Sequence, residues 1–139
     1  MSPRFALLCG KVLASGYLAW ALYKSHTFPD FLRRWTPRRP RPGRWTPEQI
    51  VDAVDLCLHL IRRRRCFLRS LLIYRLLRQM SEEPIFVIGV RHGPGGGLLG
   101  HAWIENGGQV RWPYGDDPRL YTVVLRYPYI PSPPGRGIG

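Results

Sequence analysis

The chain has 139 residues, 45% of them hydrophobic, which suffices for one modest core and is too little for two ordinary domains. Its 21 Lys and Arg residues outnumber its 9 Asp and Glu residues, so the net charge is +12. Such a surface either meets an acidic partner or remains strongly self-repelling, and charge alone does not distinguish nucleic acid, a membrane face and an acidic protein or peptide. Three cysteines, an odd number without paired spacing, argue against a disulfide scaffold and predict a reducing, cytoplasmic location.

The N-terminal stretch from Phe5 to Tyr23 predicts an apolar helix. Lys11 interrupts its apolar run and no small-residue cleavage pattern follows, which argues against a signal peptide. A membrane span needs about 20 nearly uncharged residues. We therefore expect a core helix, and a helix lying on a membrane is the alternative.

Residues 24–44 are expected to form a basic connector, because four prolines exclude a long regular element. The densest positive run in it is Arg38 to Arg44. We interpret this run as a solvated linker, with docking onto an acidic partner as the alternative. The sequence thus predicts an N-terminal helix and connector over residues 1–45.

A second helix is predicted to begin after Thr46, with Pro47 in its first position and Gln49 placed to complete a capping box. Apolar residues follow at helical spacing: Ile50, Val51, Val54, Leu58 and Ile61. Arg62 to Arg65 close the helix, where cations suit the negative end of its dipole.

Cys66 follows these arginines directly and begins a helix that runs to Met80. This helix is apolar around nearly its whole circumference, which predicts burial on more than one side. Backbone amides at a helix N-terminus and the neighbouring cations of Arg62 to Arg65 would stabilise a thiolate at Cys66. A buried structural cysteine is the alternative.

The chain after Pro84 is typical of β structure, because short runs of β-branched and aromatic residues alternate with Gly, Pro, Asn and Asp. Four strands are predicted: Ile85 to Arg91, Leu98 to Glu105, Gln109 to Trp112 and Leu120 to Tyr127. The fold class is therefore α+β, with N-terminal helices and the buried cysteine-bearing helix packed on a small antiparallel sheet. The predicted core spans residues 46–127, and residues 128–139 are expected to form a flexible Pro/Gly tail.

His101 is the histidine best placed for chemistry. Strand alternation puts His101, Trp103 and Glu105 on one face, with Ala102 and Ile104 on the other. The remaining histidines lie in the connector, on a polar helix face and in a glycine loop. A structural strand histidine is the alternative to a catalytic base.

Asp116 is the preferred partner of that imidazole. If Gly107-Gly108 forms a two-residue hairpin turn, His101 faces Tyr114. Asp116 then lies on the same face, at a diagonal distance of roughly 7 Å.

Two other carboxylates are weighed for the same role. A three-residue loop would shift the register and put Asp117 in place of Asp116. Glu105 is a weaker candidate, because Trp103 separates it from His101 on the same strand. Either aspartate could instead simply initiate the turn before Pro118.

Cys57, His59 and Cys66 are residue types that bind metals, but no Cys-x-x-Cys or His-x-x-x-His pair supports a site. We therefore predict no metal and no cofactor. Cys57 is expected to pack as a small apolar group and His59 to lie at the surface.

The order of cysteine, histidine and aspartate resembles the transglutaminase-like branch of the papain-like cysteine enzymes. Three segments are similar to the leader peptidases of lasso-peptide biosynthesis: Cys66 to Arg78, Val87 to Val90 and His101 to Glu105. The similarity also includes the helix opened by Trp45-Thr-Pro-Glu-Gln49 and covers roughly Thr46 to Tyr127.

This resemblance implies a cysteine peptidase that cuts the leader from a ribosomally made precursor peptide, after which a lasso cyclase closes the product. Cys66, His101 and Asp116 would form its triad. Fused members carry a small precursor-recognition domain, for which this chain has no room, so a stand-alone form with a separate leader-binding protein is expected.

Two rival interpretations remain. A basic binding module would attach nucleic acid or an acidic protein through Arg38 to Arg44 and Arg62 to Arg65, with no role for the thiol. A transglutaminase-type acyltransferase would use the same triad to transfer an amine. The peptidase interpretation needs no nucleic acid, and it leaves contact with a membrane open.

Overall fold

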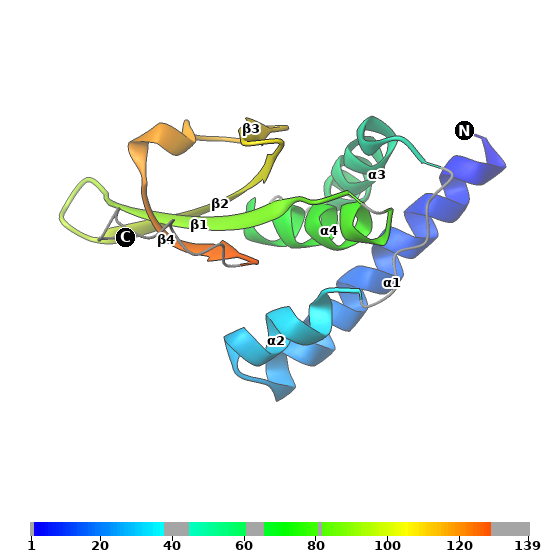
Figure 1. Cartoon of the computed structure of the whole chain (residues 1–139), viewed down its shortest axis with the longest axis horizontal. Coiled ribbons are helices and arrows are strands. Elements are labelled where there is room, and N and C mark those ends of the chain that lie inside the picture. Colours follow the sequence, from blue (N-terminus) through cyan, green and yellow to red (C-terminus); the bar gives the residue numbers. More distant parts are fainter. Residues whose placement is uncertain (1, 38–44, 61–65, 81, 129–139) are drawn as a thin grey trace.

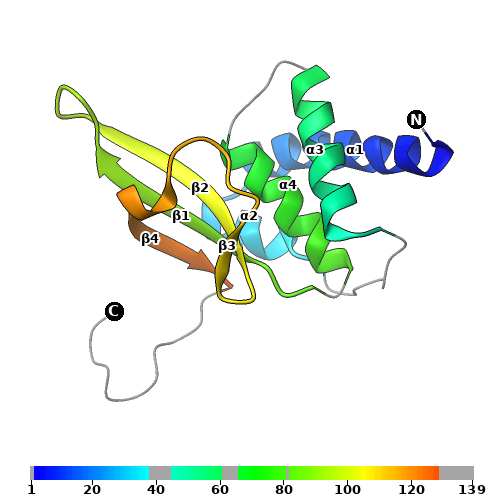
Figure 2. The ribbon, with the colours of Figure 1, turned by 90° about the horizontal axis from the view of Figure 1, so that it is seen from above.

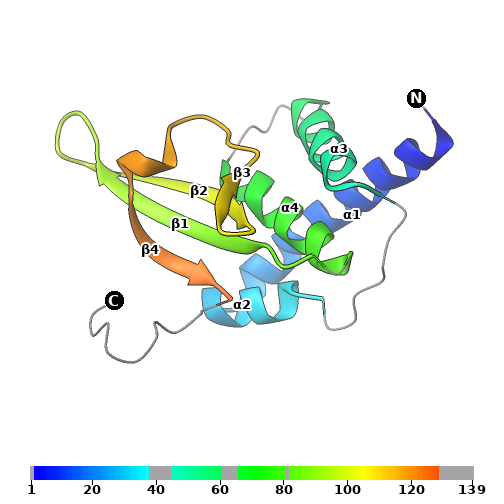
Figure 3. The same ribbon diagram turned by 45° about the horizontal axis from the view of Figure 1, so that its top comes forward.

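The computed structural model describes residues 2–37, 45–60, 66–80 and 82–128. Within them, four helices precede a four-stranded antiparallel sheet, which confirms the α+β prediction (Figure 1). Helices gather on one side of the molecule and the sheet on the other (Figure 3). The arginine runs at 38–44 and 62–65 and the tail from 129 onward, each the subject of a prediction, lie outside the described residues.

Helix α1 spans Pro3–Ser25 and helix α2 spans Phe28–Trp35. The expectation of an irregular connector over residues 24–44 was wrong where α2 forms. Proline is tolerated in the first turn of a helix, because the N–H it lacks has no partner there, and Pro29 occupies such a position. The apolar side of α2 is buried in the core through Phe31, Leu32 and Trp35.

Helix α3 spans Pro47–Leu60 and begins with the predicted capping box. The Thr46 amide donates to Gln49 Oε1 at 2.9 Å, and the Gln49 amide donates to Thr46 Oγ1 at 3.1 Å. These reciprocal bonds satisfy two amides that the helix itself leaves unpaired. The start of α3 is therefore fixed by its local sequence.

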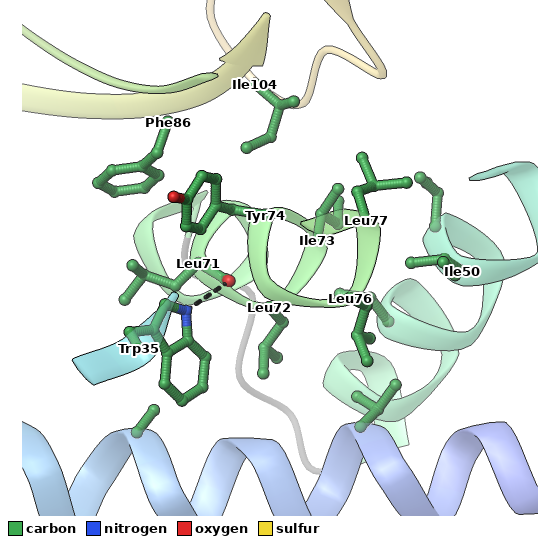
Figure 4. Packing of buried hydrophobic residues seen from close by; sticks show 14 of the residues in the cluster. Trp35, Ile50, Leu71, Leu72, Ile73, Tyr74, Leu76, Leu77, Phe86 and Ile104 are labelled. Carbon is green, nitrogen blue, oxygen red and sulfur yellow. Dashed lines mark hydrogen bonds between the residues drawn. The ribbon is translucent and has the colours of Figure 1, made fainter. Parts of the chain in front are cut away.

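Helix α4 spans Cys66–Gln79 and lies between the sheet and α1 (Figure 4). Its buried residues include Leu71, Leu72, Ile73, Tyr74, Leu76 and Leu77, which confirms burial on more than one side. Trp35 of α2 donates its indole N–H to the carbonyl of Leu71 at 2.8 Å. Helices α1 and α2 thus share one hydrophobic core with α3 and α4.

The sheet contains β1 (Ile85–His92), β2 (Leu98–Asn106), β3 (Gln109–Arg111) and β4 (Thr122–Tyr127), in the order β3-β2-β1-β4. Asn106 pairs with Gln109, so the two-residue turn was predicted correctly. Both turn residues have positive φ, 66° at Gly107 and 79° at Gly108, which glycine adopts without steric cost.

The predicted pairing of His101 with Tyr114 was wrong, because β3 ends at Arg111. Trp112 has a φ of 51°, which turns the chain away from the ladder, and Pro113 has no N–H to continue it. The following segment crosses from the β3 edge of the sheet to the β4 edge, passing over β2 and β1 (Figure 2). His101 pairs instead with Gly89 of β1.

The two faces of the sheet have different neighbours. Phe86, Ala102 and Ile104 belong to the core that the helices share. Trp103 is also buried, yet it lies outside that cluster, as strand alternation requires. The prediction that His101 and Trp103 share one face, with Ala102 and Ile104 on the other, is therefore confirmed.

Candidate active site

His101 lies in β2 and is only 7% exposed. Its ring stacks on Tyr121, with centroids 5.1 Å apart and planes at 30°, and it also contacts Trp103 at 5.8 Å. The opposite residue on β1, Gly89, makes room for this group, because a Cβ there would lie 2.8 Å from both Trp103 and Tyr121. The imidazole is therefore held by aromatic packing.

Burial lowers the pKa of His101 below its ordinary value, and the negative charge of Asp116 opposes that shift. The backbone of Asp116 opposes the shift as well. Nε2 is buried and has no hydrogen-bond partner within the described part of the chain. A neutral imidazole with an unoccupied nitrogen can accept a proton, as a general base must.

The Asp116 carboxylate is held by two other side chains. Its Oδ2 accepts a hydrogen bond from the Tyr121 hydroxyl at 2.7 Å and one from Arg91 Nη2 at 3.2 Å. The bond from Tyr121, followed by that from Arg91, lowers the pKa of Asp116. The structure thus places an anionic carboxylate near His101, and within the described residues no hydrogen bond joins that carboxylate to the imidazole.

Sequence reasoning missed Arg91 and Tyr121. The Arg91 guanidinium lies 5.2 Å from the centroid of the Tyr121 ring, so this ring contacts a cation as well as His101. Both residues reach the site through the pairing of β1 with β4, whose register shifts at a bulge between Ile88 and Gly89. The one indication in the sequence was Tyr121, an aromatic residue near the start of the strand predicted from Leu120 to Tyr127.

Cys66 is the first residue of α4 and carries a half-buried free thiol. Helix α4 packs on β2 and shares a core with Ala102 and Ile104, whereas His101 belongs to the other face. No hydrogen bond joins the Cys66 thiol to another residue in the described ranges. The contact between thiol and imidazole therefore stays a prediction, as does stabilisation of a thiolate by residues 62–65.

Arg69, one turn into α4, connects the cysteine-bearing helix to the segment that follows β3. It donates to Asp55 Oδ1 at 2.6 Å and to the carbonyl of Trp112 at 2.7 Å. Its guanidinium also lies 5.1 Å from the Tyr114 ring centroid. The same segment reaches His101, because a Cβ at Gly115 would lie 3.7 Å from His101 Cε1. Residues 112–116 thus contact both α4 and the imidazole.

The other two candidate acids have different partners. Asp117 accepts the Arg119 amide at 2.9 Å and caps a short 3-10 helix, Pro118–Leu120, so it initiates a turn. Glu105 pairs with Arg126. Of the three carboxylates considered, Asp116 is the one whose charge acts on His101.

Cys57 and His59, which were considered for a metal site, lie in different environments. Among the described residues, no group of three or more His, Cys, Asp and Glu side chains could hold a metal ion. Cys57 is buried in the core, as predicted, and its thiol donates to the carbonyl of Cys9 at 3.7 Å. Burial raises the pKa of Cys57 to about 11, which keeps it protonated. His59 is exposed, also as predicted.

Comparison with known proteins gives one match. The model of the transglutaminase-like superfamily matches residues 12–126, which include Cys66, His101 and Asp116 and extend from α1 to β4. No curated protein and no solved structure matched the chain.

Proposed function

Because this chain belongs to the transglutaminase-like superfamily, which includes cysteine peptidases and acyltransferases, we propose that it is a cysteine peptidase that removes the leader from a lasso-peptide precursor. The environment of His101 is the observation that carries the proposal. Burial favours the neutral form of its imidazole, Nε2 has no partner among the described residues, and the negative charge of Asp116 acts on the ring. These are the properties of a general base poised beside an orienting acid.

In the proposed reaction, His101 takes the proton of Cys66 and the thiolate attacks the carbonyl at the end of the leader. The Cys66 backbone amide donates to the resulting oxyanion. Collapse of this intermediate breaks the peptide bond, His101 returns the proton to the leaving amine of the core peptide, and the leader stays acylated on Cys66. Water then releases the leader. Asp116 stabilises the imidazolium while it exists.

The mechanism requires the Cys66 thiol to reach His101 Nε2 when the precursor is bound. Catalytic hydrogen bonds are often long in the absence of substrate and tighten in the complex. The segment 112–116 contacts both Arg69 of α4 and His101. A movement of this segment would therefore change the spacing between α4, which carries Cys66, and His101. Substrate binding along the segment is the step we propose to complete the site.

A separate leader-binding protein is the proposed partner. The net charge of +12 would speed association with an acidic protein or peptide. A cytoplasmic location, where precursor and partner are made, is part of the same proposal. A lasso cyclase would then use the freed amine.

The test incubates the protein with the precursor and the leader-binding protein encoded beside it, and the products are weighed by mass spectrometry. Cleavage into leader and core, lost in Cys66→Ala and retained in Cys9→Ala, supports the proposal; Cys9 is a half-buried free thiol too. An amine-transfer product would establish the acyltransferase instead. An intact precursor, with salt-dependent binding that Cys66→Ala leaves unchanged, would favour the basic binding module.

A further inference from the structure

Helix α1 forms the outer layer of the helical side of the molecule, with α4 between it and the sheet (Figure 4). Its inner side is buried through Leu8, Val12 and Ala19. Its outer side exposes large apolar residues, among them Leu7 (59%), Leu13 (51%), Tyr17 (71%) and Trp20 (57%). We call these four side chains the α1 outer face. Such a cluster on one helix is typical of an interaction surface.

The exposure of α1 distinguishes it from an ordinary core helix. Over Pro3–Lys24 it is long and apolar enough to cross a membrane, with a mean hydropathy of 1.6, yet only 22% of that window is buried. A helix that is apolar all round normally lies inside a protein or in lipid. Because one side of α1 packs on α2, α3 and α4, the α1 outer face is the apolar part of the helix that stays exposed among the described residues.

The charges on α1 favour lipid as the partner. Arg4, Lys11 and Lys24 are its charged residues, and all three are basic. Lys24 Nζ lies 4.6 Å from the Trp20 ring centroid, so a cation and an aromatic ring stand together near the helix end. Tryptophan and tyrosine prefer the headgroup level of a bilayer, and lysine can extend its ammonium to the headgroups. A second copy would instead bring two molecules of charge +12 together.

We propose that the α1 outer face binds the surface of an anionic lipid bilayer, with the helix lying in the interface and not spanning it. The inner side of α1 stays in the protein core, which a span would have to abandon. His101 belongs to the sheet face turned away from the helical core, so an attached molecule keeps that face open to a peptide. The proposal is independent of the chemistry assigned to Cys66.

The test is flotation of the full chain with vesicles of phosphatidylcholine alone and of phosphatidylcholine mixed with phosphatidylglycerol, at low and high salt. We expect binding to the anionic vesicles that weakens with salt, together with a blue shift of tryptophan emission. The variant Leu13→Ser/Tyr17→Ser/Trp20→Ser should bind at least about tenfold more weakly, because three apolar side chains no longer enter the interface.

A matched control removes two apolar side chains that are equally exposed on the sheet, Leu98 (68%) and Val124 (58%), as Leu98→Ser/Val124→Ser. This variant should bind like the unmodified chain. Equal binding by the α1 variant, equal binding to neutral vesicles, or a dimer that the α1 variant abolishes without any vesicle binding would each overturn the proposal. If the α1 variant does not fold, the emission shift of the unmodified chain on anionic vesicles decides the question.

Discussion

The hydroxyl of Tyr121 donates a hydrogen bond of 2.7 Å to Asp116 Oδ2. The ring of the same tyrosine stacks on His101 at 5.1 Å. One side chain therefore orients both the acid and the imidazole, and Arg91 contacts the same ring and donates to the same carboxylate. The relative position of His101 and Asp116 depends on this tyrosine, which itself has no step in the proposed chemistry.

Replacing Tyr121 with phenylalanine should raise the pKa of Asp116 toward its ordinary value. The hydroxyl is the largest cause of the lowered pKa, and the variant removes it while keeping the ring. Titration of the Asp116 carboxyl carbon by NMR measures the change. Tyr23→Phe, at an exposed tyrosine on α1, is the matched control. An Asp116 pKa that does not move in Tyr121→Phe would contradict the assigned role.

Replacing Asp116 with asparagine should lower the pKa of His101 further, because the negative charge of Asp116 opposes the effect of burial. A histidine whose folded pKa is depressed contributes stability above its unfolded pKa of 6.5, and that contribution is lost as pH falls through the folded pKa. We therefore expect a steeper loss of stability below pH 6.5 in the variant.

The measurements are the pH titration of the His101 ring proton by NMR and urea midpoints on both sides of that pH. Asp117→Asn serves as the control, since Asp117 is engaged by Arg119. A His101 pKa that rises in Asp116→Asn would rule out the electrostatic coupling.

Gly89→Ala should destabilise the fold by about 1–3 kcal/mol. The added Cβ would lie 2.8 Å from both the Trp103 ring and the Tyr121 Cβ, so one of them must move. Gly100→Ala on the neighbouring strand is the control, because nothing lies within 4 Å of its Cβ position. Urea unfolding compares the two variants, and equal stabilities would show that the packing around Gly89 can relax.

Asp55→Ala should cost about 2 kcal/mol, because it leaves the buried guanidinium of Arg69 without its carboxylate. It should also speed amide hydrogen exchange in residues 112–116, since Arg69 holds the Trp112 carbonyl. Asp52→Ala, at an exposed position of the same helix, should change neither quantity by more than a few tenths of a kcal/mol. Unchanged exchange in Asp55→Ala would separate Arg69 from the order of that segment.

Local signals predicted most of the fold. The capping box at Thr46 and the two glycines after Asn106 each act within a few residues, and both are present. Helix α2 was not predicted, because proline breaks a helix in its interior, whereas Pro29 lies in the first turn, where it is tolerated. What stabilises α2 is the burial of Trp35 against α4, a contact between distant parts of the chain.

The site was predictable only in part. Strand alternation correctly placed His101 and Ala102 on opposite faces of the sheet. The predicted path by which Asp116 reaches the histidine was wrong, because the chain leaves the ladder at Trp112, before Tyr114. Tyr121 and its partner Arg91 depend on a bulged pairing between strands far apart in sequence, which no local pattern encodes. The contact between the thiol and the imidazole stays a prediction.

Because the chain leaves the sheet at Trp112, the length of the Gly107-Gly108 turn affects where Asp116 lies relative to His101. The two-glycine turn sets which residue follows the last β2–β3 pair, and hence where the chain begins to cross toward His101. Relatives with one residue inserted or deleted in this turn would need a compensating change before their aspartate to keep it beside the histidine. Turn length and the position of the acid should therefore covary within the family.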